Sequence, residues 1–97
     1  MRVQRNEWEI KPGRMPEARA LLKEWAGLPK APEFKRVYES AYMQFNVLAF
    51  EMEWESMAEE EKAWAAFFAT PQFAALWKKW SELVVVGRQE IWSAVKM

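Results

Sequence analysis

The amino-acid sequence predicts an α+β domain, a four-stranded antiparallel sheet with helices on one face, in the chain order β-α-β-β-α-(α)-β. Two observations lead to this prediction. Apolar residues recur at every second position over residues 48–54, as on one face of a strand, and at helical spacing in segments on either side. Turn and capping residues separate these segments. The 97 residues are expected to form a single domain, 1–97, with a modest core.

The first strand is expected at residues 3–10, with Asn6 and Trp8 on one face. The Lys-Pro-Gly sequence that follows is typical of a turn. A helix then begins at Pro16, because apolar residues recur at the spacing of an amphipathic helix: Ala18, Leu21, Leu22 and Trp25. A glycine and a proline just beyond them are expected to end this helix.

The second strand is expected at residues 33–43, where the alternation is less regular and Tyr38 and Tyr42 share a face. Only Met43 and Gln44 separate it from the next strand, so the two strands should form a hairpin. Neither residue favours the positive φ of a tight two-residue turn, and a looser loop is expected there.

The central strand covers residues 45–54. One face carries only large apolar side chains: Leu48, Phe50, Met52 and Trp54. The other face is apolar from Phe45 to Ala49 and acidic from Glu51 onward. Because a strand with one solvated face should alternate from its start, its first half should be covered on both faces. This pattern is the first indication of a partner.

Two helices follow the central strand. Ser56 and Glu59 have the spacing of a capping box, and the first helix carries a stripe of large apolar residues: Met57, Trp64, Phe67 and Phe68. The acidic run 59–61 is interpreted as a solvated helix start rather than a metal site. Thr70 and Pro71 cap and start a second helix with its own stripe: Phe73, Leu76, Trp77, Trp80 and Val84.

The valine run 84–86 and Gly87 are expected to break this helix, and residues 88–95 to form the last strand. The resulting order is the split β-α-β pattern of ferredoxin-like sheets.

Composition excludes several classes of function. The formal net charge is zero and no basic run occurs, which argues against nucleic acid. No signal peptide or transmembrane segment is found, so neither a membrane nor secretion is expected and the cytoplasm is the default location. Without His, Asp or Cys, zinc sites and Ser-His-Asp triads cannot form, and three glycines are too few for a phosphate-binding loop. No metal or cofactor is predicted.

Aromatic content points to partners. Seven Trp and six Phe are more large aromatic surface than one small domain easily buries. A homodimer, a ligand pocket, or both would absorb the excess.

Three segments, EWEIKPGRMPEARALLKEW, NVLAFEMEWESMAEEEKAW and GRQEIWSAV, resemble the dimeric α/β-barrel superfamily, and most of all its NIPSNAP-like members. The resemblance covers nearly the whole chain, but its motifs are mostly structural. It implies a homodimer in which two four-stranded sheets pack face to face with the helices outside. Met43-Gln44 departs from relatives that often carry a glycine there.

More distantly, the chain is similar to antibiotic-biosynthesis and haem-degrading monooxygenases of the same superfamily. Those enzymes use an asparagine on the first strand, which aligns with Asn6. Phe67 falls near their tryptophan and Trp77 near their haem-ligating histidine. The missing histidine argues against haem turnover, whereas oxygenation of a quinol without a cofactor would need no metal.

Candidate site residues follow from these patterns. Asn6 lies on an apolar strand face and needs a polar partner, either neighbouring backbone or a ligand. Glu51 is either a partly buried base of raised pKa or a salt-bridged carboxylate. The remaining candidates for ligand contact are aromatic, with ordinary core packing as the alternative for each: Trp8, Tyr38, Trp64, Phe67 and Trp77.

Three hypotheses follow. The first is a NIPSNAP-like homodimer that binds a small apolar or aromatic molecule between sheet and helices. The second is a cofactor-independent monooxygenase or isomerase acting on a small aromatic or quinol substrate, with Asn6 orienting it and Glu51 or a tyrosine moving a proton. The third is a structural or interaction module without a ligand. The sequence does not decide whether the protein is an enzyme.

Overall fold

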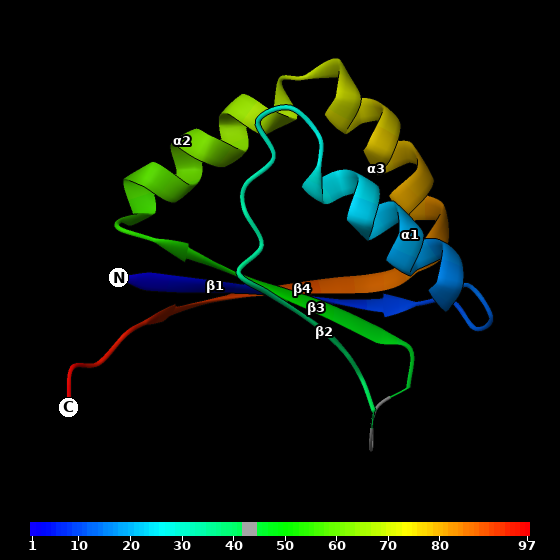
Figure 1. The fold of residues 1–97 in the computed structure, drawn as a ribbon, viewed down its shortest axis with the longest axis horizontal. Coiled ribbons are helices and arrows are strands. Elements are labelled where there is room, and N and C mark those ends of the chain that lie inside the picture. Colours follow the sequence, from blue (N-terminus) through cyan, green and yellow to red (C-terminus); the bar gives the residue numbers. More distant parts are fainter. Residues whose placement is uncertain (42–44) are drawn as a thin grey trace.

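The computed structural model describes residues 1–41 and 45–97, which form an open four-stranded antiparallel sheet with three helices on one face (Figure 1). The strands lie in the order β2-β3-β1-β4. In chain order the elements are β1 (Arg2–Ile10), α1 (Met15–Ala26), β2 (Arg36–Glu39), β3 (Val47–Trp54), α2 (Met57–Phe68), α3 (Pro71–Leu83) and β4 (Val84–Ser93). The predicted α+β class and ferredoxin-like order are confirmed.

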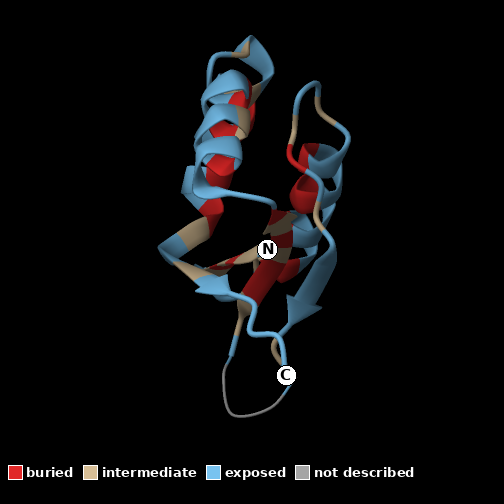
Figure 2. Cartoon of the chain, turned by 90° about the vertical axis from the view of Figure 1, so that its left-hand side faces the viewer, coloured by how far each residue is buried: buried red, intermediate tan, exposed pale blue. Residues whose placement is uncertain are grey.

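The two central strands determine which side chains form the core. Strand β1 pairs with β3 over eight residues, and Asn6 lies opposite Phe50. Because side chains alternate between the two faces of a strand, every second residue of β3 points toward the helices. These four residues are all buried: Leu48, Phe50, Met52 and Trp54. Figure 2 shows buried residues on the inner sides of the helices and on the strands beneath them. The predicted apolar face of β3 is therefore the floor of the core.

Strand β2 is shorter than the expected 33–43. Backbone hydrogen bonds extend its pairing by one residue at each end, from Lys35 N to Glu51 O and from Ser40 N to Val47 O. Before Lys35 the chain leaves the sheet, and the Phe34 ring stacks on Phe50 with centroids 4.3 Å apart. The predicted loop at Met43-Gln44 lies outside the described residues, as does Tyr42.

Strand β4 begins earlier than the expected 88–95. It follows α3 directly at Val84, which pairs with Ile10 of β1, and a register shift between Glu9 and Ile10 absorbs the extra residue. The helix ends at Leu83, as the valine run predicts, but Gly87 lies within the last strand, opposite Trp8, instead of before it. β-branched residues favour strand geometry, so the valine run starts the strand instead of preceding it.

The helix caps are confirmed, but the apolar stripes of α2 and α3 are confirmed only in part: Val84, predicted in the stripe of α3, begins β4, and Trp77 is exposed. Ser56 Oγ accepts a hydrogen bond from Glu59 N, and Thr70 Oγ1 accepts one from Phe73 N. In α2, however, Met57 and Phe68 are exposed, while Glu60 is only 7% exposed. The buried face of α2 therefore includes the carboxylate of Glu60.

The aromatic excess lies in two places. Trp25, Trp80, Phe50 and Phe67 are completely buried at the centre of the core. The exposed tryptophan and phenylalanine residues instead line the pocket between the helices and the sheet, at Phe68 and Trp77, or lie away from the helices, at Phe45 and Trp92.

Candidate functional site

A pocket of about 310 Å³ lies between helices α2 and α3 and the β1–β4 half of the sheet. Its walls are mainly aromatic: Trp8, Trp25, Trp64, Phe68, Phe73 and Trp77. Three polar residues complete the lining: Asn6, Glu60 and Gln89. Phe68 and Trp77 are 53% and 40% exposed, whereas Asn6, Glu60 and Trp64 are all buried. The pocket thus has an aromatic mouth and a buried interior with two polar groups.

A hydrogen-bonded network around Gln4 supports the buried end of the pocket. Gln4 is 1% exposed, and its Oε1 accepts hydrogen bonds from the indole nitrogens of Trp54 and Trp64, both at 2.9 Å. Its Nε2 donates to Oδ1 of Asn6, also at 2.9 Å. The network joins β1, β3 and α2 through one side chain.

The chemistry of these groups fixes the direction of every bond in the network. An indole N–H can only donate, so the group that two tryptophans share on Gln4 must be its oxygen. The Gln4 nitrogen therefore points to Asn6, which must accept with its own oxygen. The Asn6 nitrogen, with two donor hydrogens, finds no acceptor among the described residues. It is thus the group with which Asn6 can meet a ligand.

Glu60 supplies the only ionisable side chain that lines the described pocket. It lies one helical turn before Trp64 on α2, and its carboxylate forms no ion pair or hydrogen bond with the described residues. Desolvation by burial raises the pKa of the Glu60 carboxyl, and the negative charge of Glu61 raises it further.

The position of Trp8 depends on Gly87. These residues are opposite each other in the β1–β4 pair, and a Cβ atom on Gly87 would lie 2.4 Å from Cζ3 of Trp8. The indole therefore lies directly against the glycine, which is a common reason for glycine within a strand. From there Trp8 contacts Trp77 and Trp80 edge to face, at centroid distances of 5.9 and 5.7 Å. A side chain on Gly87 would displace one wall of the pocket.

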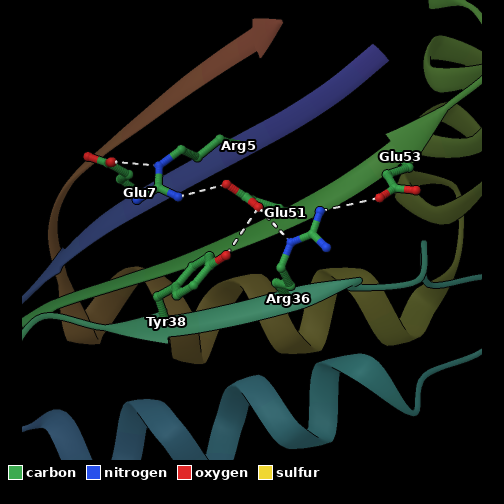
Figure 3. A network of polar contacts seen from close by, with 6 residues as sticks. All are labelled: Arg5, Glu7, Arg36, Tyr38, Glu51 and Glu53. Carbon is green, nitrogen blue, oxygen red and sulfur yellow. Dashed lines mark hydrogen bonds and ion pairs between the residues drawn. The ribbon is translucent and has the colours of Figure 1, made fainter. Parts of the chain in front are cut away.

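Glu51 lies on the opposite face of the sheet, where it joins a network of charges (Figure 3). It pairs with Arg5 at 2.9 Å and with Arg36 at 3.0 Å, and the Tyr38 hydroxyl donates to it at 3.4 Å. Hydrogen bonding from Arg36 holds the pKa of Glu51 below its ordinary value, against a smaller opposing effect of burial, and Arg5 lowers it further. The interpretation of Glu51 as a base of raised pKa is therefore wrong, and the salt-bridged alternative is found.

The structure brings four of the seven candidate residues together in the pocket: Asn6, Trp8, Trp64 and Trp77. Phe67 is completely buried and stacks on Trp25, so it belongs to the core. Tyr38 and Glu51 lie on the other face of the sheet, separated from Asn6 by the sheet itself. For Asn6, the polar partner is a side chain instead of the neighbouring backbone.

Sequence reasoning missed Gln4 and Glu60, although both carried a signal. Gln4 lies two residues before Asn6 and so shares its strand face. Glu60 lies three residues after Met57 and four before Trp64, which places it on the predicted buried stripe of α2. Its place in an acidic run made it look like one of three solvated residues.

Residues 1–41 and 45–97 show neither a metal-binding cluster nor a membrane-spanning helix. They contain no cluster of three His, Cys, Asp or Glu side chains able to hold a metal ion. No helix in this part of the chain is long and apolar enough to cross a membrane.

Solved structures share this fold. No known family model matches the sequence, and no curated protein matches it significantly. An uncharacterized NIPSNAP domain protein from Burkholderia xenovorans superposes with a TM-score of 0.88 at 14% identity, over 98% of this chain and 95% of that one. A NIPSNAP family protein from Agrobacterium tumefaciens gives 0.87 at 14% identity, over 97% and 92%.

A more distant neighbour is a putative antibiotic biosynthesis monooxygenase from Deinococcus radiodurans. It superposes with a TM-score of 0.68 at 13% identity, over all of this chain and 95% of that one. At these identities the likeness concerns the fold. The structural neighbours are therefore NIPSNAP domain proteins and, at greater distance, monooxygenase-like proteins, in agreement with the resemblance noted in the sequence.

Proposed function

We propose that the protein is a NIPSNAP-like homodimer that binds a small apolar or aromatic molecule in the pocket between its sheet and helices. The observation that carries this proposal is the buried Asn6 amide, which the Gln4 network directs toward an aromatic cavity. A few well-placed polar groups in an apolar pocket are typical of small-molecule sites. The volume of about 310 Å³ is at the lower end of the range for such sites.

The open face of the sheet supports the dimer part of the proposal. It carries exposed apolar side chains at Phe45, Val86 and Trp92, which are 87%, 60% and 58% exposed. Phe45 and Val86 also line a groove of about 520 Å³ beside the charge network. Face-to-face packing of two such sheets would cover these side chains and give a dimeric α/β barrel. Aromatic residues at the centre of an interface often contribute most of its binding energy.

Two exposed tryptophans allow both parts to be tested with one pair of variants. Trp77 lies at the pocket mouth, and Trp92 lies on the open face opposite Val3 of β1. Each protein is screened by thermal shift against quinols, flavonoid-like aromatics, aromatic amines and fatty acids, and its mass is measured by light scattering. A ligand at about a hundred times its Kd adds about 2.7 kcal/mol to stability, which raises the Tm by several degrees.

We expect Trp77→Ala to lose the ligand shift and remain a dimer, and Trp92→Ala to weaken the dimer and keep the ligand shift. Each variant is the control for the other. A wild-type protein that is monomeric at micromolar concentration contradicts the dimer. No shift with any compound contradicts the ligand and favours a structural or interaction module, whose tryptophans serve only packing.

A second candidate function is a cofactor-independent monooxygenase or isomerase. The pocket position of Asn6 favours it, as does the likeness to a structure described as a putative antibiotic biosynthesis monooxygenase. In such an oxygenation the bound quinol supplies both electrons, one oxygen atom enters the substrate and the other leaves as water. The proton acceptor would be Glu60, which lines the pocket, because Glu51 and Tyr38 face away from it.

Oxygen consumption with a panel of quinols tests this second function. Asn6→Ala is expected to abolish turnover and to leave the dimer intact. The conservative variant Glu51→Gln is the control and should retain turnover, because Glu51 is on the other face. Unchanged turnover in Asn6→Ala would remove Asn6 from the mechanism.

A further inference from the structure

The charged groups that line the pocket are of one sign. Among the described residues that line it, Glu60 carries the only formal charge and no lysine or arginine is present. The ion pairs in the described chain engage other carboxylates, and the network around Glu51 holds two arginines on the far face of the sheet. The pocket therefore contains a negative group without a positive counterpart.

The carboxylate of Glu60 is also poorly solvated. The residue is 7% exposed, and its side chain finds no hydrogen-bond donor among the described residues. An ionised carboxylate in such a place costs free energy unless a positive charge or donor hydrogens approach it. The groups from the other elements that line the pocket are uncharged: Asn6 and Trp8 on β1, Trp25 on α1, Phe73 and Trp77 on α3, and Gln89 on β4.

Aromatic rings continue from Glu60 around the wall. The rings of Trp64 and Phe68 have centroids 5.5 Å apart, and Phe68 is 4.7 Å from Phe73. Phe73 stacks on Trp77 at 5.8 Å, and Trp77 meets Trp8 at 5.9 Å. Five rings from three elements thus form one contiguous wall. Such rings attract a cation through their negative faces, and tryptophan does so most strongly.

We propose that the ligand of this pocket is an organic cation: an amine or quaternary ammonium compound with a small aromatic or alkyl body. Its ammonium group lies beside Glu60 against the aromatic wall, and an oxygen on its body accepts a hydrogen bond from the Asn6 amide. This inference depends on the proposed ligand-binding function and specifies its ligand class. It also disfavours anionic ligands such as fatty acids, whose carboxylate would be repelled by Glu60.

A matched pair of probes separates charge from shape. The 3-hydroxyphenyltrimethylammonium ion and 3-tert-butylphenol have the same outline and the same hydroxyl, and differ in the charge of one central atom. Binding of each to the 97-residue protein is measured by titration calorimetry. We expect the cation to bind at least ten-fold more tightly than its neutral counterpart. Glu60→Gln should weaken binding of the cation ten-fold and change the affinity for the phenol by less than two-fold.

Glu61→Gln is the matched control, because it removes the neighbouring exposed carboxylate and should change cation binding by less than two-fold. If the phenol binds as tightly as the cation to the wild-type protein, the cation proposal is overturned and the proposed ligand-binding function stands. Binding of neither probe, together with no response in the thermal screen, overturns both. Should Glu60→Gln fail to fold, the comparison of the two probes on the wild-type protein still decides.

Discussion

Two glutamates, one on each side of the sheet, have opposite electrostatic environments. Glu51 on the open face is held by two arginines and a tyrosine, and its pKa is lowered (Figure 3). Glu60 lines the pocket on the helix-covered side, where the other described lining residues are aromatic or uncharged, and its pKa is raised. The difference shows that the partners decide the chemistry of a carboxylate, because charge pairing stabilises its ionised form and desolvation does the opposite.

The same contrast applies to the neutral polar groups. On the helix-covered face, the buried Gln4 side chain is satisfied through directed hydrogen bonds, one of which engages the oxygen of Asn6. On the open face, the polar groups are partly buried ions paired across neighbouring strands, such as Arg5 and Glu51. The first arrangement is specific and costly to disturb, whereas water can replace much of the second. Four variants test this comparison.

The largest effect is expected for Gln4→Leu. It leaves the indole N–H groups of Trp54 and Trp64 buried without their acceptor, which should lower the free energy of unfolding by about 3 kcal/mol. Urea denaturation measures it. Gln89→Leu, an exposed glutamine in the same sheet, is the control and should change stability by less than about 0.5 kcal/mol. Equal stability of Gln4→Leu and the wild type would show that the network does not support the covered face.

Next in size is Gly87→Ala. Its Cβ would overlap the Trp8 ring at 2.4 Å, so the ring must move and stability should fall by about 2 kcal/mol. Near-ultraviolet circular dichroism should change as the tryptophan cluster rearranges. Gly27→Ala provides the control, because the nearest atom to its Cβ is at 3.7 Å and a loss of stability is not expected. An unchanged tryptophan signal in Gly87→Ala would contradict the contact.

A smaller effect, of about 1 kcal/mol at pH 7, is expected for Glu51→Gln, because it breaks ion pairs that water can partly reach through the arginines. The native state holds Glu51 ionised below its ordinary pKa of 4.5. Its contribution is therefore complete above that pH and is lost as pH falls toward the lower native value. The difference in Tm between wild type and variant should shrink in acid. A difference that grows in acid would contradict the pairing.

The smallest effect, and one of opposite sign, is expected for Glu60→Gln. Because burial raises the native pKa, the native state binds the proton more tightly than the unfolded chain does. The wild type therefore loses stability as pH rises from about 4.5 through the raised value, whereas the variant does not. At pH 8 Glu60→Gln should be more stable by less than about 1 kcal/mol, and at pH 4 it should match the wild type. A variant that is less stable at pH 8 would indicate a cationic partner within the chain.

Much of the candidate site could be predicted from local patterns. Alternation put Asn6 and Trp8 on one strand face, and helical spacing put Trp64 and Trp77 on the sides of their helices that meet that face. Phe67 has the same helical spacing but lies in the core. Spacing shows which side of the helix a ring is on, but not whether that ring lines a pocket or is completely buried. The placement of Glu51 failed because its partners are 46 and 15 residues away and meet it only through strand register.

By itself, the sequence determined the order of strands and helices, the caps at Ser56 and Thr70, and the apolar face of the central strand. These features depend on residues a few positions apart, whose geometry is fixed by the periods of helix and strand. Only the tertiary structure decided that Glu60 is the carboxylate in the pocket. It also decided that Gln4 orients Asn6 and that Trp8 packs against Gly87. Those relations depend on register and on packing between elements that are distant in the chain, and local periodicity carries no information about either.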